Sequence, residues 1–256
     1  MDPINAILLG IIQGLTEFLP ISSSGHLVLG QHFLGIENSG VLLEVVLHLG
    51  TLISILLYYR CDIMDLLQGI FKGDSESLIY ALMVIVATLP ALIVGLLLKV
   101  QLERLFLPQF VPYMMLITGV ILITTKYVSS THIKLTFQIA ILIGFAQVLA
   151  MLPGVSRSGI TISLAIFLGI HRGNAAKFSF FMAIPVLLGA GILQIKEVSG
   201  ASIEILPLFL GFLSAFITGY IVIKWLIEII SNQHFWKFSY YCIFVGLLCI
   251  FFGVGG

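Results

Sequence analysis

Long apolar stretches separated by short polar connections run through most of the sequence. A hydrocarbon core about 30 Å thick needs roughly 20 helical residues to cross it. Six stretches reach or approach this length: 41–59, 78–98, 111–125, 177–195, 205–223 and 238–255. The connections 60–77, 99–110, 126–134, 196–204 and 224–237 are too short for a soluble domain. The pattern therefore predicts one all-α, polytopic membrane domain over residues 1–256, with six transmembrane helices.

Two apolar regions, 4–36 and 135–170, are broken by polar residues. The first break is EFLPISSSGH at 17–26, and the second is LPGVSRSGIT at 152–161. An apolar run of about eleven residues follows each break, and as a helix it would cover about 16 Å, near half the membrane. Irregular backbone at membrane depth needs protein or water around it. We therefore expect two re-entrant helical hairpins, each with a polar tip.

The two broken regions resemble each other and predict an internal duplication. Gln, Leu-Pro and Ser-x-Ser-Gly recur 133 or 134 residues apart, beginning at Gln13 and Gln147. Such self-similarity indicates repeated halves, here about 1–126 and 127–256. Three expected spans separate the hairpins, and this odd number makes them enter from opposite faces. Their tips can then meet near the midplane, as in inverted-topology repeats.

The composition supports a membrane protein. The chain is 59% hydrophobic and 9% charged, whereas soluble domains carry about 25% charged residues. The formal net charge is zero, so nothing favours nucleic acid as a partner. Basic residues favour one side, expected to be cytoplasmic, by eight to three. The eight are Arg60, Lys72, Lys126, Lys134, Arg172, Lys177, Lys224 and Lys237, against Lys99, Arg104 and Lys196.

Smaller features predict local structure. Asp2 before Pro3 predicts a helix N-cap followed by a first-turn proline. Cys61 is expected in a connection, and Cys242 and Cys249 as buried thiols. Close helix approach is expected at four glycines, Gly189, Gly191, Gly211 and Gly219.

The two polar tips carry the candidate chemistry. Glu17, His26 and Arg157 are ionisable groups at a depth where charge is costly. One reading is an internal ion pair between Glu17 and Arg157 that only joins the halves. In the other, each Ser-x-Ser-Gly starts a half-helix whose amides and dipole attract an anion, and Arg157 adds a fork suited to phosphate. The expected phosphate-binding residues are Gln13, Ser22, Ser24, Gly25, Gly154, Ser156, Ser158 and Gly159.

The first tip also holds reactive groups. Gln13 and Glu17 are four residues apart and share a helix face, and the carboxylate there can bind a divalent cation or accept a proton. Ser22, Ser23 and Ser24 offer hydroxyl nucleophiles, and His26 could act as base and then acid. These parts suit phosphoryl transfer. Elsewhere, Glu44 and His48 are either a second layer around this site or a helix-stabilising pair.

The tips carry a family resemblance. QGLTEFLPISSSGH resembles the first signature of the bacterial undecaprenyl-pyrophosphate phosphatases linked to bacitracin resistance, and LPGVSRSG resembles the second. The resemblance continues through EVVLHLGTL and AAKFSFFMAIP. It implies hydrolysis of undecaprenyl pyrophosphate to the monophosphate and phosphate, which recycles a carrier lipid for cell-wall synthesis.

The resemblance also implies roles for particular residues. Glu17, Ser23, His26 and Arg157 match the catalytic positions, and Gln13 and Glu17 match an acidic motif that binds magnesium or calcium. Many members carry glutamate where this chain has Gln13. The implied location is the bacterial inner membrane, with the site toward the periplasm or cell exterior; a homodimer is left open.

Two other classes of protein stay open at this stage. Inverted repeats with broken helices are also transporter architecture, so a secondary transporter or a flippase for a lipid phosphate is the main alternative. Such a protein would need the same anion site and would release no phosphate. Whether serine or water is the nucleophile is also open.

Overall fold

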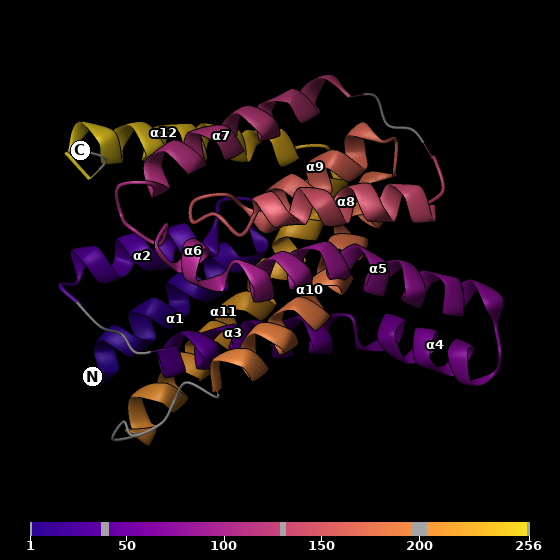
Figure 1. Cartoon of the computed structure of the whole chain (residues 1–256), viewed down its shortest axis with the longest axis horizontal. Helices are drawn as coiled ribbons and strands as arrows, with labels where there is room; N and C mark the ends of the chain where they lie inside the picture. Colours follow the sequence, from indigo (N-terminus) through magenta and orange to yellow (C-terminus); the bar gives the residue numbers. More distant parts are fainter. Residues whose placement is uncertain (1, 37–40, 129–131, 196–203, 255–256) are drawn as a thin grey trace.

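The computed structural model describes residues 2–36, 41–128, 132–195 and 204–254, and no strand occurs among them. The helices follow one another along the chain (Figure 1): α1 (Pro3–Phe18), α2 (Ser23–Phe33), α3 (Val41–Tyr58), α4 (Arg60–Phe71), α5 (Ser75–Leu97), α6 (Lys99–Glu103), α7 (Val111–Thr124), α8 (Phe137–Leu149), α9 (Arg157–Phe167), α10 (Arg172–Ile195), α11 (Ile205–Ser231) and α12 (Phe238–Phe251). Two short 3-10 turns, η1 (Thr125–Tyr127) and η2 (Phe235–Lys237), adjoin α7 and α12.

Three helix starts follow from local sequence. The side chain of Asp2 accepts a hydrogen bond from Ile4 N at 3.0 Å, which confirms the predicted N-cap. Helix α2 begins after Ser22, and α9 begins after Ser156; each serine side chain accepts from the amide three residues on. The first serine of each Ser-x-Ser-Gly is therefore the cap, and the residue after it opens the helix.

The helix contacts come in equivalent pairs. When each helix is replaced by its counterpart in the other half of the chain, one contact of a pair becomes the other. In the hairpins, α1 packs on α2, and α8 packs on α9. Helix α1 also packs on α11 of the second half, and α8 packs on α5 of the first half. Helices α3 and α10 contact each other, and α7 lies beside α12 along one edge (Figure 1). Corresponding partners occur in both halves, as a duplicated chain would give.

Glycine permits the closest of these contacts. A Cβ on Gly10 would lie 2.4 Å from the Gly211 carbonyl oxygen of α11. A Cβ on Gly144 of α8, 134 residues later, would lie 2.5 Å from the Ala87 carbonyl oxygen of α5. Gly211 and Gly219 lie at close contacts as predicted. The prediction is wrong for the other two: a Cβ on Gly189 would meet no atom within 4 Å, and one on Gly191 would lie 3.9 Å from the nearest atom.

One expected boundary is wrong, and one expected connection contains a helix. Helix α11 does not end at residue 223 but continues to Ser231, because Leu226 and Ile230 stay buried on the packed face. The connection 60–77 contains a helix, α4, which is bent by 72° from α3 and buries no residue. Cys61 is thus helical and exposed; Cys242 and Cys249 are buried as predicted.

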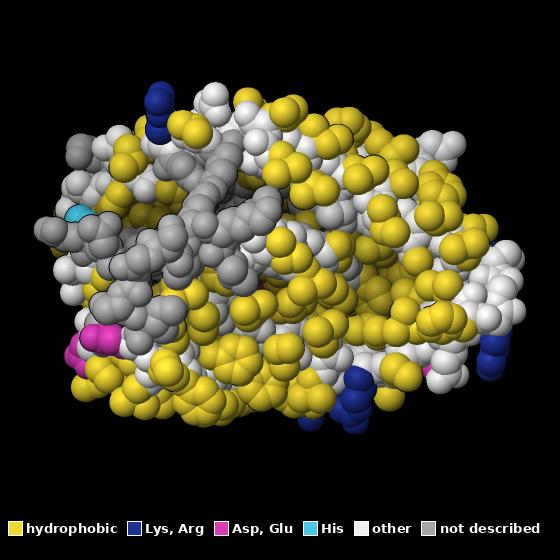
Figure 2. Space-filling view, turned by 60° about the horizontal axis from the view of Figure 1, so that its bottom comes forward, with side chains coloured by type: hydrophobic (Ala, Val, Ile, Leu, Met, Phe, Trp, Pro, Cys, Tyr) yellow, Lys and Arg dark blue, Asp and Glu magenta, His cyan; other side chains and the backbone are white. Residues whose placement is uncertain are grey.

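Apolar side chains cover much of the outer surface. Figure 2 shows hydrophobic side chains over most of the described surface on that face, with lysine and arginine near its edges. By length and composition, α5, α10 and α11 could each cross a membrane, and the bent pair α3–α4 could be a fourth span. The chain is thus a helical, multi-pass membrane protein. Helices α7 and α12 are shorter, so the count of six spans stays a prediction.

Candidate active site

The two polar tips touch each other inside the helix bundle. The Ser22 hydroxyl oxygen accepts a hydrogen bond from Gly154 N at 3.1 Å. In the other direction, the Ser158 hydroxyl donates to the Leu19 carbonyl oxygen at 3.1 Å. A Cβ on Gly25 would lie 3.0 Å from the Gly154 Cα. Segments about 130 residues apart in sequence therefore form one centre, as the duplication predicted.

Internal hydrogen bonds already use several of the amides expected to hold an anion. Gly25 N donates to Ser22, and Gly159 N donates to Ser156. The Ser156 amide donates to Thr118 of α7 at 3.2 Å. A phosphate that used these amides would have to displace the capping bonds. The side chains at the tips are therefore the groups most available to a ligand, and the phosphate-binding roles of Ser24 and of these amides stay predictions.

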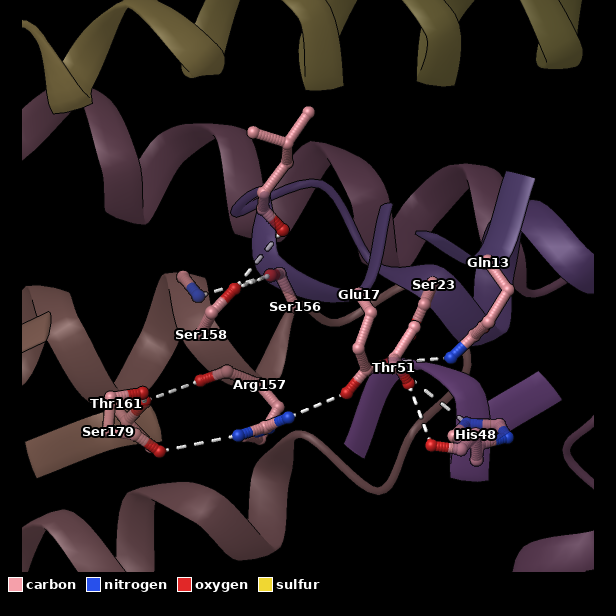
Figure 3. A network of polar contacts seen from close by, with 12 residues as sticks. Gln13, Glu17, Ser23, His48, Thr51, Ser156, Arg157, Ser158, Thr161 and Ser179 are labelled. Atoms are coloured by element: carbon pink, nitrogen blue, oxygen red, sulfur yellow. Dashed lines mark hydrogen bonds and ion pairs between the residues drawn. The ribbon is translucent and has the colours of Figure 1, made fainter. Parts of the chain in front are cut away.

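Glu17, at the end of α1, is the centre of the polar cluster (Figure 3). Its Oε1 accepts from Arg157 Nη2 at 2.6 Å, and its Oε2 accepts from the Ser23 hydroxyl at 2.6 Å and from Gln13 Nε2 at 3.0 Å. Glu17 is 7% exposed. A carboxylate buried to this extent needs a partner charge, and Arg157 supplies it. The sequence-based prediction that Glu17 and Arg157 converge is confirmed.

Ser23 and Arg157 occupy equivalent places in the two halves. Each is the first residue of its half-helix, directly after the serine cap. Arg157 is also held by the backbone oxygen of Ser179 on α10, which accepts from Nη1 at 3.3 Å. The guanidinium is thus fixed in direction, and a hydroxyl and a cation from opposite tips meet at the two edges of one carboxylate.

His26 lies apart from the hydrogen bonds around Glu17. Its Nδ1 contacts the Ser22 carbonyl oxygen at 2.7 Å, and its Nε2 contacts the Tyr241 hydroxyl at 2.8 Å. Because a carbonyl only accepts, Nδ1 carries the proton, and Nε2 of the neutral ring accepts from Tyr241. The sequence did not identify Tyr241 as a partner of His26, because nothing distinguishes it from the other seven tyrosines of the chain. The proposed proton transfer by His26 remains a prediction.

His48 of α3 adjoins the cluster from the side opposite to Arg157. Its Nε2 is 4.0 Å from Glu17 Oε2. The spacing of Glu44 and His48 identified this pair, but their link is through the backbone: His48 Nδ1 is 2.8 Å from the Glu44 carbonyl oxygen. The reading of His48 as a second layer around the site therefore agrees with the geometry.

Two candidate ligands for a cation lie beside each other at Glu17. Gln13 is fully buried, and its Oε1 has no hydrogen-bond partner in the described part of the chain. This orphan oxygen and the Glu17 carboxylate are the donor types that hard divalent cations prefer. Within the described ranges, no three His, Cys, Asp or Glu side chains form a metal-binding group. These residues fit a cation that takes its remaining ligands from a substrate phosphate.

An apolar groove opens beside His26. It has a volume of about 300 Å³ and runs between α2 and α12. Its walls include Leu29, Val245, Leu248 and Phe252, and the polar atoms of His26 and Tyr241 lie among them. This volume is at the lower end of the range for small-molecule sites.

The fold and the site define a class: a multi-pass helical membrane protein with a carboxylate, a hydroxyl and a guanidinium gathered between two polar hairpin tips. Comparison with known proteins gives the family. Residues 6–248 match the family model described as bacitracin resistance protein BacA, and the chain belongs to this family.

Curated relatives match over almost the whole chain. The undecaprenyl-diphosphatase of Christiangramia forsetii is 42% identical, with 98% of both chains covered. That of Methanobrevibacter smithii is 41% identical, covering 99% of this chain and 98% of the relative. That of Desulfosudis oleivorans is 40% identical, covering 99% and 100%.

Proposed function

We propose that this protein is an undecaprenyl-diphosphatase, which hydrolyses undecaprenyl pyrophosphate to undecaprenyl phosphate and inorganic phosphate and so recycles the carrier lipid of cell-wall synthesis. The observation that carries the proposal is the contact of Ser23 and Arg157 with the two edges of Glu17. This cluster joins a nucleophile, a proton acceptor and a phosphate-binding cation. The names of the relatives supply the substrate.

The contacts support a two-step mechanism. Ser23 Oγ attacks the terminal phosphorus while its proton passes to Glu17 Oε2, 2.6 Å away. The bond from that phosphorus to the bridging oxygen breaks, and undecaprenyl phosphate leaves. The departing lipid phosphate takes the proton from Glu17. Water then attacks the phosphoserine and passes a proton through Glu17 to Ser23 Oγ, which releases phosphate and restores the Ser23 hydroxyl. As Glu17 becomes protonated, its ion pair with Arg157 weakens, and Arg157 neutralises charge on the phosphoryl oxygens.

The same proposal gives the cation a place. Glu17 and Gln13 would hold it together with the diphosphate, because the protein's oxygen donors alone do not complete a coordination shell. When bound, a divalent cation such as magnesium or calcium neutralises phosphate charge and orients the group that is transferred.

The groove between α2 and α12 suits the first units of the prenyl tail. A diphosphate held at the tips and a tail in this groove would place His26 and Tyr241 at the junction of the polar and apolar parts of the substrate. His26 would then contact the phosphates from that side, while Glu17 takes the Ser23 proton, a role expected from the sequence for His26.

The proposed membrane arrangement has six spans and two re-entrant hairpins that enter from opposite faces of a bacterial inner membrane. The exchange-related packing of the two halves supports this arrangement. The distribution of basic residues favours a site that opens to the periplasm or cell exterior.

Phosphate release by the purified protein tests the function. With undecaprenyl pyrophosphate and a divalent cation, we expect turnover, and about a 10³-fold loss in Arg157→Ala. The matched control is Arg104→Ala, at an exposed arginine. A transporter or flippase would bind the lipid and release no phosphate, which would reject the proposal. Near-normal turnover of Arg157→Ala would reject the assignment of the site.

A further inference from the structure

The hydrogen bond between His48 and Glu44 fixes where the His48 ring carries its proton. Nδ1 lies 2.8 Å from the Glu44 carbonyl oxygen, and a carbonyl cannot donate. Nδ1 is therefore the donor, and in the neutral form of the ring Nε2 carries the lone pair. Histidines that bind metals are typically arranged in this way, with the other ring N–H given to a carbonyl or carboxylate.

The free Nε2 faces the cluster at the tips. It lies 4.0 Å from Glu17 Oε2, and Figure 3 shows His48 and Gln13 on the same side of the cluster. Two acceptors at this separation repel each other unless a positive group lies between them. Two metal–ligand bonds of about 2.1 Å each can reach across about 4.2 Å. The His48 side chain is 31% exposed, so a cation has access.

We propose that His48 Nε2 is a ligand of the divalent cation, together with Glu17 Oε2 and Gln13 Oε1. The proposal rests on the proposed function, because the cation and the diphosphate share this site. Gln13 Oε1 is a buried oxygen that has no hydrogen-bond partner among the described residues. Arg157 is bound to Oε1 of Glu17, so the guanidinium and the cation use opposite edges of the carboxylate.

A nitrogen ligand changes which metal the site prefers. Imidazole suits first-row transition metals, whereas magnesium and calcium take oxygen ligands. This chain also has the neutral Gln13 beside Glu17, so the site carries less negative charge to attract a hard cation. We therefore expect Mn²⁺ to bind more tightly than Mg²⁺ or Ca²⁺.

Electron spin-echo spectroscopy of bound Mn²⁺ tests the proposal directly. The purified full-length protein is loaded with Mn²⁺ and methylenediphosphonate, a diphosphate that cannot be hydrolysed. We expect modulation from ¹⁴N, replaced by the ¹⁵N pattern when the protein is made with ¹⁵N-histidine. His48→Gln should abolish this modulation and weaken Mn²⁺ binding at least about tenfold. The matched control, His132→Gln at an exposed histidine, should leave both unchanged.

The outcomes separate this proposal from the proposed function. Bound Mn²⁺ without histidine modulation in the wild-type protein overturns the proposal, whatever the variants do. Modulation that persists in His48→Gln, or in His48→Asn if the first variant does not fold, also overturns it. If the protein binds no Mn²⁺ in the presence of the diphosphonate, the proposal is also overturned. Phosphate release in the same preparations tests the function separately: modulation without release would reject the phosphatase and retain His48 as a ligand.

Discussion

The two oxygens of Glu17 have separate tasks at the scale of single residues. Oε1 is paired with Arg157, and Oε2 accepts from Ser23. Arg157 is thus kept off the oxygen that takes the Ser23 proton, and a cation held on the same Oε2 would have to leave it as Glu17 becomes protonated. Hydrogen bonding of Ser23 on the second edge makes serine, rather than water, the nucleophile that the geometry favours.

A phosphoenzyme at Ser23 is the expected result of that choice. Acid quenching during turnover should trap phosphate on Ser23, identified by peptide mass spectrometry. Ser23→Ala should lower kcat by at least about 10³-fold, and Glu17→Gln should slow the formation of the phosphoenzyme by about 10²–10⁴-fold because the base is lost. The neighbouring Ser24→Ala should have a much smaller effect, since Ser24 contacts Ser22 instead of Glu17. Turnover with no phosphoserine at any time would indicate water as the nucleophile.

The sequence predicted which residues form the site better than it predicted their hydrogen-bond partners. Glu17, Ser23 and Arg157 could be found because polar residues within membrane-spanning apolar segments are energetically costly and therefore mark functional sites. The direction of His26 could not, because it depends on Tyr241 of α12, 215 residues away. The approach of His48 to Glu17 likewise depends on how α3 is placed against α1, which a periodic pattern does not specify.

At the scale of elements, the positions of the helices depend on a few close contacts. Gly10→Ala would add a methyl group 2.4 Å from a backbone oxygen of α11. Because that atom cannot move without the helix, we expect a loss of about 1–3 kcal/mol of stability. The matched control is Gly189→Ala in α10, which has nothing within 4 Å and should gain up to about 1 kcal/mol from helix propensity. Thermal denaturation in one detergent compares them, and equal midpoints would contradict this account of the packing.

The wall of the groove on α12 gives a second test at this scale. Leu248 lines the groove, while Leu247 is 55% exposed and does not line it. Leu248→Trp should raise KM for undecaprenyl pyrophosphate several-fold, because the larger ring fills space needed by the tail. Leu247→Trp should leave KM unchanged. Equal values of KM for the two variants would place the tail elsewhere.

Helix existence was easier to predict than helix ends. Apolar runs long enough for a helix gave α3, α5, α7 and α12 within a few residues. The end of α11 was missed because the basic Lys224 falls where the apolar run was expected to end, although Leu226 and Ile230 keep the following turns packed. Helix α4 was missed because its exposed, mixed composition resembles that of a loop.

At the scale of the whole molecule, the site depends on helices of each half packing against helices of the other half. Helix α1 carries Glu17 but packs on α11 of the second half, and α8, which leads to Arg157, packs on α5 of the first. Each tip is thus positioned by the other half. The duplication and its consequence for the site could be predicted from the repeated motif, whereas the exchange of packing partners could not.

The orientation of the molecule can be measured with a native cysteine. Cys61 is exposed near the start of α4, in the connection that leads into α5, while Gln109 is exposed beyond the far end of this 23-residue helix. A helix of that length covers about 35 Å, so the two positions should lie on opposite sides of the membrane. The excess of basic residues around Arg60 predicts that Cys61 is cytoplasmic.

A maleimide that cannot cross membranes should therefore leave Cys61 unmodified in intact cells and modify it in inside-out vesicles. Gln109→Cys, in a Cys61→Ser background, should give the reverse. Cys61→Ser alone should remain unlabelled in both preparations, because Cys242 and Cys249 are buried. If Cys61 reacts in intact cells and Gln109→Cys does not, the molecule is inverted, and the first hairpin and the substrate enter from the cytoplasmic side.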